Sequence, residues 1–232
     1  YIYILISHNP FMKNSLFISL LFFQLFSFAQ ITNAQNRIID GDNVNISDYP
    51  WQVALWGLQE NGVYETCGAT IISDQWVITA AHCVYGNDPN TTFIFAGNSS
   101  LFSQNSNQYS VDEYYIHPNY SNDNLEPETP YMTHDIALVK IQGSFNFNQY
   151  HQPINLITNE EVQLGSQSEG VIATITGWGY IDNNGISPET LQLVELPIMS
   201  IESVLELGLP SYSFDESMIF VQNQKTLLMY LS

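Results

Sequence analysis

The sequence predicts an all-β fold on three observations. After Ile38 the chain breaks into many short apolar or alternating runs, separated by Gly, Pro, Asn, Asp and Ser, which is typical of antiparallel sandwiches and barrels. Asn61-Gly62, Asn87-Asp88 and Asn183-Asn184-Gly185 offer residues that tolerate the positive φ of tight turns. Helix signals are scarce: one helix is expected over Ser200–Leu207, capped by Ser200.

Each apolar run gives one expected strand. The expected strands are Trp51–Trp56, Ala69–Ser73, Trp76–Thr79, Thr92–Phe95, Tyr109–Ile116, Ile136–Ile141, Val171–Thr176 and Leu191–Ile198. Ser121–Pro130, rich in Asn, Asp, Glu and Pro, is expected to be a polar surface loop. A chain of 232 residues with 45% hydrophobic content suffices for one domain of ordinary size, or two small ones sharing a core.

The charge balance is strongly acidic. Four Lys and Arg residues stand against 23 Asp and Glu residues, a formal net charge of −19. Such a surface repels phosphate backbones and anionic lipid head groups. We therefore expect no nucleic-acid partner, and a cationic partner or substrate is favoured.

The N-terminal region has the features of a secretory signal peptide. Met12-Lys13-Asn14 gives a positive start, Leu16–Phe26 is a mainly apolar run, and Ser27 and Ala29 are small residues at the positions that a signal peptidase recognises. The alternative, a membrane-spanning helix, needs ~20 apolar residues, so no stable membrane insertion is expected. The expected division is an upstream or non-native extension over 1–11, a signal peptide over 12–29 and a short pro-segment over 30–37. The mature protein is expected to be secreted and extracellular.

Cys67 and Cys83 are the only two cysteines. An exported chain meets an oxidising compartment, so we expect them to pair. The bridge would close a loop of about 15 residues, for which the chain-entropy model gives about 3 kcal/mol. Two cysteines outside any Cys-x-x-Cys pair do not build a four-ligand zinc site, so no metal or other cofactor is expected.

Two short segments carry candidate chemistry. In Thr79–Cys83, His82 is flanked by small residues and a cysteine at the end of an apolar strand, where an imidazole would be held in place. In Asp135–Lys140 a carboxylate stands at the start of a strongly apolar strand, and a buried charge there needs a strong partner. Taken singly, His82 could equally be a packed histidine and Asp135 a turn residue.

Together with five further motifs, in order, these segments resemble the chymotrypsin/trypsin-like serine protease family (peptidase S1) over roughly residues 37–200. The other motifs are Arg37-Ile38-Ile39-Asp40-Gly41, Tyr49-Pro50-Trp51-Gln52-Val53, Cys67-Gly68, His117-Pro118-Asn119-Tyr120 and Thr176-Gly177-Trp178-Gly179. The resemblance implies a trypsin-like double antiparallel β-barrel with the active site between the barrels. The N-terminal barrel would occupy 38–150, and 151–232 would form a C-terminal barrel that is incomplete in this chain.

The resemblance also implies roles. His82 would be the base that takes a serine's proton, and Asp135 would fix its tautomer and stabilise its charged form. The Cys67–Cys83 bridge would pin the strand end that presents His82. Arg37–Ile38 would be the activation cleavage site of a zymogen. Expected partners are a protein or peptide substrate, an activating protease and a protein inhibitor.

The nucleophile is not present in the chain. The family places it in Gly-Asp-Ser-Gly-Gly-Pro, whose backbone N–H groups also form the oxyanion hole, and no such string occurs among the 232 residues. Asp215–Phe220 resembles the strand that precedes this segment, whereas Gln224–Ser232 matches no family pattern. Ser232 lacks the following glycines and is not expected to be the nucleophile.

We therefore expect a chain truncated before the nucleophile and inactive in this form, from a family of secreted endopeptidases. The alternative is a non-catalytic homologue that acts as a secreted binding or regulatory protein. An unrelated β-sandwich adhesion module would leave the ordered motifs unexplained. The preferred residue before the scissile bond is not predicted, because the family builds that pocket mainly from the missing segment.

The remaining histidines receive structural interpretations. His117 and His134 are expected in loops or at strand edges, and His151 on the surface. Four Asn-x-Ser/Thr motifs begin at Asn45, Asn90, Asn98 and Asn119; whether they carry glycans depends on the source and is left open.

Overall fold

The all-β prediction is confirmed by a computed structural model of the chain. The structure describes residues 41–58, 62–101, 103–120, 134–181, 187–207 and 218–222, and the backbone of 227–231. The expectations for the signal peptide, the pro-segment, Arg37–Ile38, the loop Ser121–Pro130, the turn at Asn183–Gly185 and Ser232 lie outside these residues.

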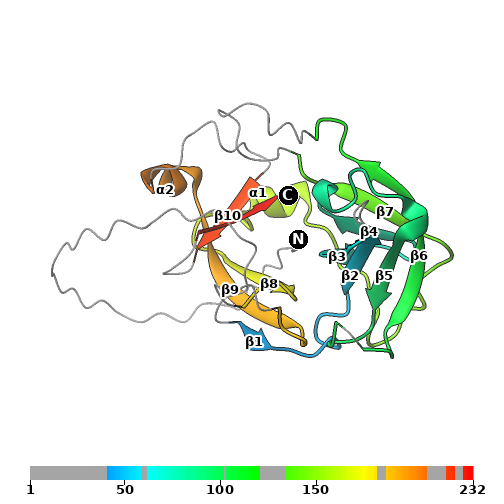
Figure 1. The fold of residues 1–232 in the computed structure, drawn as a ribbon. Helices are drawn as coiled ribbons and strands as arrows, with labels where there is room; N and C mark the ends of the chain where they lie inside the picture. Colours follow the sequence, from blue (N-terminus) through cyan, green and yellow to red (C-terminus); the bar gives the residue numbers. More distant parts are fainter. Residues whose placement is uncertain are drawn as a thin grey trace.

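Six strands close into an antiparallel barrel in the order β2-β3-β4-β7-β6-β5 (Figure 1). Their bounds are β2 Gln52–Leu58, β3 Tyr64–Ile71, β4 Trp76–Thr79, β5 Thr92–Ala96, β6 Asn107–Ile116 and β7 Ala137–Ile141. All six expected strands of this region are present. A closed barrel leaves no unpaired strand edge, so the barrel can hold its two ends in a fixed geometry.

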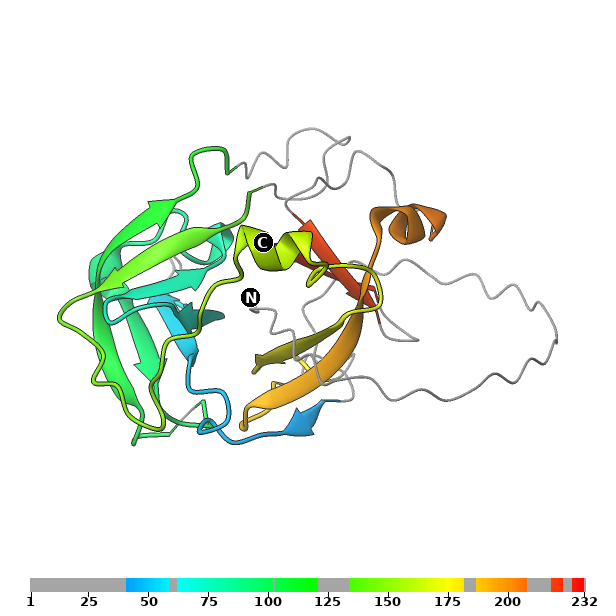
Figure 2. The same cartoon turned by 180° about the vertical axis from the view of Figure 1, so that it is seen from behind.

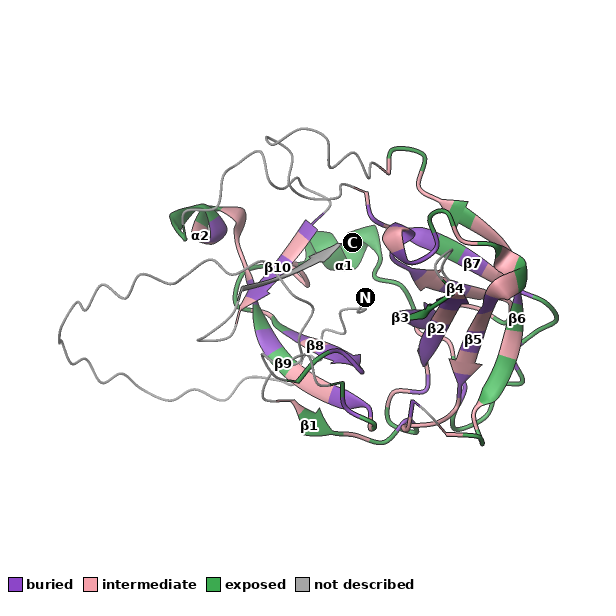
Figure 3. Cartoon of the chain, in the orientation of Figure 1, coloured by how far each residue is buried: buried purple, intermediate pink, exposed green. Residues whose placement is uncertain are grey.

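The barrel core follows the period of two that strands impose on their side chains. In β5 the residues Thr92, Ile94 and Ala96 are buried and the two between them less so, and β7 buries Ala137, Val139 and Ile141 in the same way. The interior is apolar: Val53, Leu55, Ala69, Ile71, Val77 and Val111 also lie in it. Figure 3 shows this buried lining on the barrel strands.

β1 and four strands from the second half of the chain form a five-stranded sheet, which has the order β1-β9-β10-β11 with β8 paired to β9 (Figure 2). Its strands are β1 Asp42–Asn43, β8 Ile172–Gly177, β9 Gln192–Met199, β10 Met218–Gln222 and β11 Leu227–Leu231. Within the described residues this sheet does not close, which agrees with the incomplete second barrel that the sequence predicts. β1 lies in the range expected for the first barrel, yet its strand pairing is with β9.

Apolar packing and buried hydrogen bonds join the barrel to the second sheet. Ile46, Ala54, Leu101, Trp178 and Leu191 form one buried cluster drawn from both parts. Buried Thr176 of β8 donates to the Gln52 side chain of β2 at 2.8 Å. The indole N–H of Trp178 donates to the carbonyl of Ser99 at 2.8 Å.

The helices are short. They are the 3₁₀ turns η1 Ala81–Cys83 and η2 Pro89–Thr91 and the α-helices α1 Asn159–Gln163 and α2 Ile201–Glu206. α2 confirms the expected helix, with the Ser200 hydroxyl accepting from the Ser203 N–H at 3.1 Å. α1 was not expected, although Thr158 and Glu161 form a capping box. No helix in the described part of the chain has the length and hydropathy to cross a bilayer.

The expectation that His151 lies on the surface is wrong. Its exposed fraction is 3%, and its ring nitrogens lie 3.0 and 3.1 Å from the side-chain nitrogens of Asn148 and Asn107. Burial lowers the pKa of His151. The absence of a Cβ at Gly97 makes room for the ring, because a methyl group there would come within 2.4 Å of His151 Nε2.

We expect Gly97→Ala to destabilise the protein by about 1–3 kcal/mol more than Gly143→Ala, because overpacking a buried ring adds to the backbone strain. Both glycines have similar positive φ, +83° and +81°, but a Cβ at Gly143 would meet nothing within 4 Å. Gly143→Ala therefore measures the strain of the left-handed backbone alone. Urea unfolding of the two variants, followed by tryptophan fluorescence, gives the comparison. Equal losses would show that His151 is not held against Gly97.

Candidate active site

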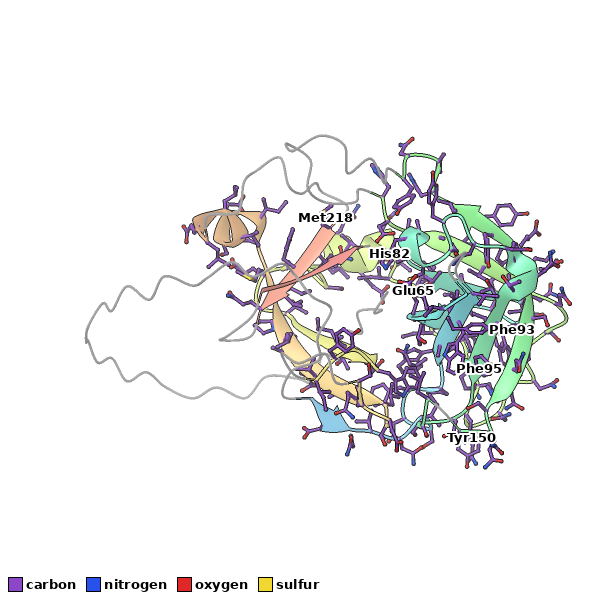
Figure 4. The ribbon with its side chains drawn as sticks, in the orientation of Figure 1. Glu65, His82, Phe93, Phe95, Tyr150 and Met218 are labelled. Atoms are coloured by element: carbon purple, nitrogen blue, oxygen red, sulfur yellow. A yellow bond between two sulfur atoms is a disulfide. The ribbon has the colours of Figure 1, made fainter. Side chains whose placement is uncertain are left out.

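His82 lies in the 3₁₀ turn that follows β4. The Thr79 hydroxyl at the strand end donates to the Gly68 carbonyl of β3 at 2.8 Å, which fixes the point where the chain leaves the sheet. Ala80 and Ala81 are 2% and 0% exposed, and larger side chains would push the turn away from the barrel. His82 therefore stands at a defined place, on the side of the barrel that faces β10 (Figure 4).

Asp135 precedes β7 and lies at the centre of a three-residue turn. The Ile136 N–H donates to the His134 carbonyl at 2.8 Å, the hydrogen bond of a γ-turn. His134 has a φ of 53°, in the left-handed region where non-glycine residues are uncommon but histidine is enriched. This turn directs Asp135 inward, where its exposed fraction is 2%.

The two residues meet through two hydrogen bonds. Nδ1 of the His82 ring lies 2.6 Å from Asp135 Oδ2, and the His82 backbone N–H donates to Oδ1 at 2.7 Å. Each carboxylate oxygen thus has a donor, which a buried charge requires. With its proton held at Nδ1, a neutral imidazole leaves Nε2 as a proton acceptor. The His82 side chain is 25% exposed, so the ring is partly accessible to solvent.

Tyr120 is affected by the same carboxylate. Burial is the main cause that raises the pKa of Tyr120 to about 12, and the charges of Asp135 and Tyr85 raise it further. The rings of Tyr85 and Tyr120 pack edge-to-face with centroids 5.4 Å apart. Tyr120 therefore lies close enough to Asp135 to be affected by its charge, and the sequence analysis gave Tyr120 no role.

The expected disulfide is present and lies beside the histidine. Cys67 of β3 and Cys83 of η1 are bonded, with Cα atoms 6.2 Å apart, which ties the His82 turn to the barrel wall. Cys83 Sγ lies 3.5 Å from His82 Nε2. Cys67, His82 and Cys83 have ligand atoms within 4.8 Å of one another, but both sulfurs are used in the disulfide and Nδ1 faces Asp135. This cluster is therefore not suited to hold a metal.

His117 and His134 lie outside the strands, as expected, and they support the Asp135 turn. Their rings stack with centroids 4.7 Å apart and planes 15° from parallel. The His117 backbone N–H donates to the Ile136 carbonyl at 3.0 Å. His134, which begins the turn that directs Asp135 inward, thus packs against the His117 ring.

The arrangement can accept and return a proton at Nε2 and can stabilise the resulting imidazolium through Asp135. In the described part of the chain no hydroxyl is hydrogen-bonded to the His82 ring. The pairing of His82 with Asp135 has the geometry that the sequence analysis expected of a base and its orienting carboxylate.

Comparison with known proteins gives one consistent result. The sequence model of the family described as Trypsin matches residues 38–225. Mouse ovochymase-2 is 37% identical over 170 residues, which are 72% of this chain and 26% of that protein. Trypsin from Phaedon cochleariae is 35% identical over 173 residues, 73% of this chain and 60% of that protein. Human chymotrypsin-like elastase family member 1 is 36% identical over 170 residues, 72% of this chain and 60% of that protein.

The chain thus spans between 26% and 60% of the length of these curated relatives.

Solved structures agree on the fold. A structure of GrC superposes with a TM-score of 0.67 at 23% identity, covering 81% of this chain and 76% of that one. Neuropsin, a serine protease expressed in the limbic system of mouse brain, gives a TM-score of 0.65 at 29% identity, covering 81% and 75%.

We expect Asp135→Asn to lower the pKa of Tyr120 from about 12 while leaving it above the ordinary value of 10.0, because burial remains the larger cause. Tyr114 is the matched control: its pKa is also raised to about 12, by burial and by Asp88 rather than Asp135. The measurement is phenolate absorbance after a rapid jump in pH, with Tyr120→Phe and Tyr114→Phe to assign the signals.

The jump must be rapid because a phenol whose pKa is raised in the folded state stabilises the protein below pH 10 and loses that contribution as the pH rises towards 12. An equal fall in the pKa of both tyrosines would indicate a general loosening of the structure. It would contradict a specific effect of Asp135 on Tyr120.

Proposed function

Because the chain belongs to the trypsin family of serine proteases, we propose that it forms the base-and-carboxylate part of a secreted endopeptidase that hydrolyses peptide bonds of protein substrates. The observation that supports this most directly is the pairing of the His82 ring with buried Asp135 at 2.6 Å. A serine hydroxyl is a weak nucleophile at neutral pH and needs such a base beside it.

The proposed mechanism follows from the two nitrogens of one ring. Nε2 of His82 takes the proton of the attacking serine while Nδ1–H stays hydrogen-bonded to Asp135. The imidazolium then donates its proton to the leaving amine, and an acyl-enzyme forms. Water, deprotonated by the same nitrogen, releases the acyl group and restores the serine.

The proposal places the nucleophile in sequence beyond the 232 residues given. A Gly-Asp-Ser-Gly-Gly segment, which would also supply oxyanion-hole N–H groups, does not occur among them. The 232-residue chain by itself is therefore proposed to be inactive. The proposal retains the signal peptide over 12–29, the pro-segment over 30–37, the N-terminal barrel over 38–150 and the partial C-terminal barrel over 151–232.

The second candidate is a non-catalytic homologue that binds or regulates another secreted protein. The missing Gly-Asp-Ser-Gly-Gly segment favours it. The intact contact between His82 and Asp135 favours the endopeptidase, because a barrel without catalysis has no evident need for a buried carboxylate that orients a partly exposed imidazole. A protein inhibitor and an activating protease remain proposed partners of the endopeptidase alone.

We expect the 232-residue chain to show no labelling by a serine-directed fluorophosphonate probe. The complete transcript is expected to encode Gly-Asp-Ser-Gly-Gly downstream, and its product to be labelled at that serine. In that product His82→Ala should abolish labelling, and Asp135→Asn should slow peptide hydrolysis about 10⁴-fold, because the amide would favour the wrong tautomer.

Stoichiometric labelling of any serine in the 232-residue chain would refute the proposal. A stop codon after Ser232, with no such segment downstream in any frame, would favour the non-catalytic homologue.

We expect light trypsin treatment of the secreted protein to cut first between Arg37 and Ile38. Arg37 is the only arginine, and Lys140 and Lys225 are the only later lysines. Lys140 lies within β7 and pairs with Asp112 and Glu113 at 3.2 and 3.1 Å, which protects it. N-terminal sequencing should give Ile-Ile-Asp-Gly, and the matched variant Arg37→Gln should resist cutting there. The 232-residue chain should gain no activity from this cut, and a first cut at Lys140 would contradict the expectation.

A further inference from the structure

The structure separates the four Asn-x-Ser/Thr motifs into two kinds. Such a motif is an acceptor for N-glycosylation in a secreted protein, and the acceptor atom is the side-chain nitrogen of the asparagine. A glycan on a folded protein requires that this nitrogen lie at the surface with room for a large polar group. The inference rests on the proposed secretion, because transfer takes place in the secretory pathway.

Asn98 does not meet this requirement. It is half-buried, and both ends of its amide are used: Nδ2 donates to the Ser103 hydroxyl at 2.9 Å, and Oδ1 accepts from the Ser100 N–H at 2.8 Å. The next residue, Ser99, holds the barrel to the second sheet through bonds to Ile46 and Trp178, each of 2.8 Å. Because transfer precedes folding, a chain that received a glycan at Asn98 could not form this junction and would not reach the folded, secreted state.

Asn119 lies at the opposite extreme. It is exposed, and within the described part of the chain its side-chain amide makes no hydrogen bond. Only its backbone N–H is used, donating to His117 Nδ1 at 3.2 Å. Both Nδ2 protons of Asn119 are free of protein partners in this part of the chain, so a sugar can be attached without breaking a contact.

Asn45 and Asn90 are also exposed. Oδ1 of Asn45 accepts from the Ser47 N–H at 3.2 Å, which leaves Nδ2 unused among the described residues. Nδ2 of Asn90 donates to Asp88 Oδ1 at 2.9 Å. An amide nitrogen has two protons and a glycosylated one keeps a single proton, so this exposed bond can persist beside a sugar.

We propose that Asn45, Asn90 and Asn119 carry N-linked glycans and that Asn98 stays unmodified in the folded, secreted protein. The donor is an oligosaccharide on a lipid diphosphate. A bond forms between Nδ2 and the anomeric carbon of the sugar, the bond from that carbon to the diphosphate oxygen breaks, and Nδ2 loses one proton as the lipid diphosphate leaves.

The Asn119 glycan lies closest to the catalytic pair. Asn119 is bonded to His117, the His117 ring stacks on His134 at 4.7 Å, and His134 directly precedes Asp135. Tyr120, the next residue, is subject to the charge of Asp135. The glycan would therefore stand beside the site that a protein substrate has to approach.

The test uses the full chain with an added initiating methionine, expressed in a eukaryotic secretory host. One form keeps its own N-terminal region and a second form has an unrelated signal peptide in front. The secreted protein is treated with N-glycosidase F in heavy-oxygen water, which converts each glycosylated Asn to a labelled Asp, and peptide masses give the occupancy of each site. We expect label at Asn45, Asn90 and Asn119 and none at Asn98.

Single variants give an independent measurement. Asn45→Gln, Asn90→Gln and Asn119→Gln should each remove one glycan step in gel mobility, and Asn98→Gln is the matched control that should remove none. Label on Asn98 in the secreted protein, or an unlabelled Asn119, would overturn the inference. If the chain is retained in the cell, the same labelling is measured on the membrane fraction, because glycan transfer precedes folding. An unlabelled Asn45, Asn90 or Asn119 in that fraction would also overturn the inference. If glycans are found only on the form with the unrelated signal peptide, the proposed signal peptide is refuted, and the inference about the glycosylation sites still holds.

Discussion

The buried carboxylate of Asp135 is the constraint on which the rest of the site depends. Its charge must be matched by donors inside the barrel, and both come from His82, which lies 53 residues earlier in the chain. The end of β4 and the start of β7 must therefore be neighbours, and the pairing of Thr79 with Ala137 makes them so. The His82 turn is anchored by the disulfide and by the Thr79–Gly68 hydrogen bond. This anchoring matters because loss of the His82 backbone N–H or of its Nδ1–H as a donor would leave one oxygen of the buried carboxylate without a partner.

The sequence predicted the elements whose signal is local. The alternation in β5 and β7, the apolar run of β4 and the Ser200 cap of α2 each lie within a few residues, and all four elements are present. α1 has an equally local signal, the Thr158–Glu161 capping box, but the sequence analysis did not predict this helix. β1 is different in kind, because a two-residue strand has no pattern of its own and exists through its pairing with β9, about 150 residues away.

The same distinction holds for the site. His82 and Asp135 were predicted from their motifs, whereas their contacts depend on the barrel. His151 was expected on the surface, but it is buried, and Gly97 and Asn107, which lie against its ring, are 44 or more residues earlier in the chain. The stack of His117 on His134 and the proximity of Tyr120 to Asp135 have no local signal either. They arise because the barrel brings the end of β6 beside the start of β7, where Ile116 pairs with Ala137.

The proposed catalytic groups are divided unequally between the two parts of the fold. His82 and Asp135 both lie at the ends of barrel strands, so the proposed proton transfer would depend on a unit whose strands close on themselves. The second sheet supplies no group to this pair among the described residues, and it is joined to the barrel through Gln52, Ser99 and the Trp178 cluster. The contact between His82 and Asp135 is therefore made entirely by residues of the barrel. In the proposed endopeptidase, the nucleophile and its oxyanion donors would come from a separate segment that approaches Nε2 of His82.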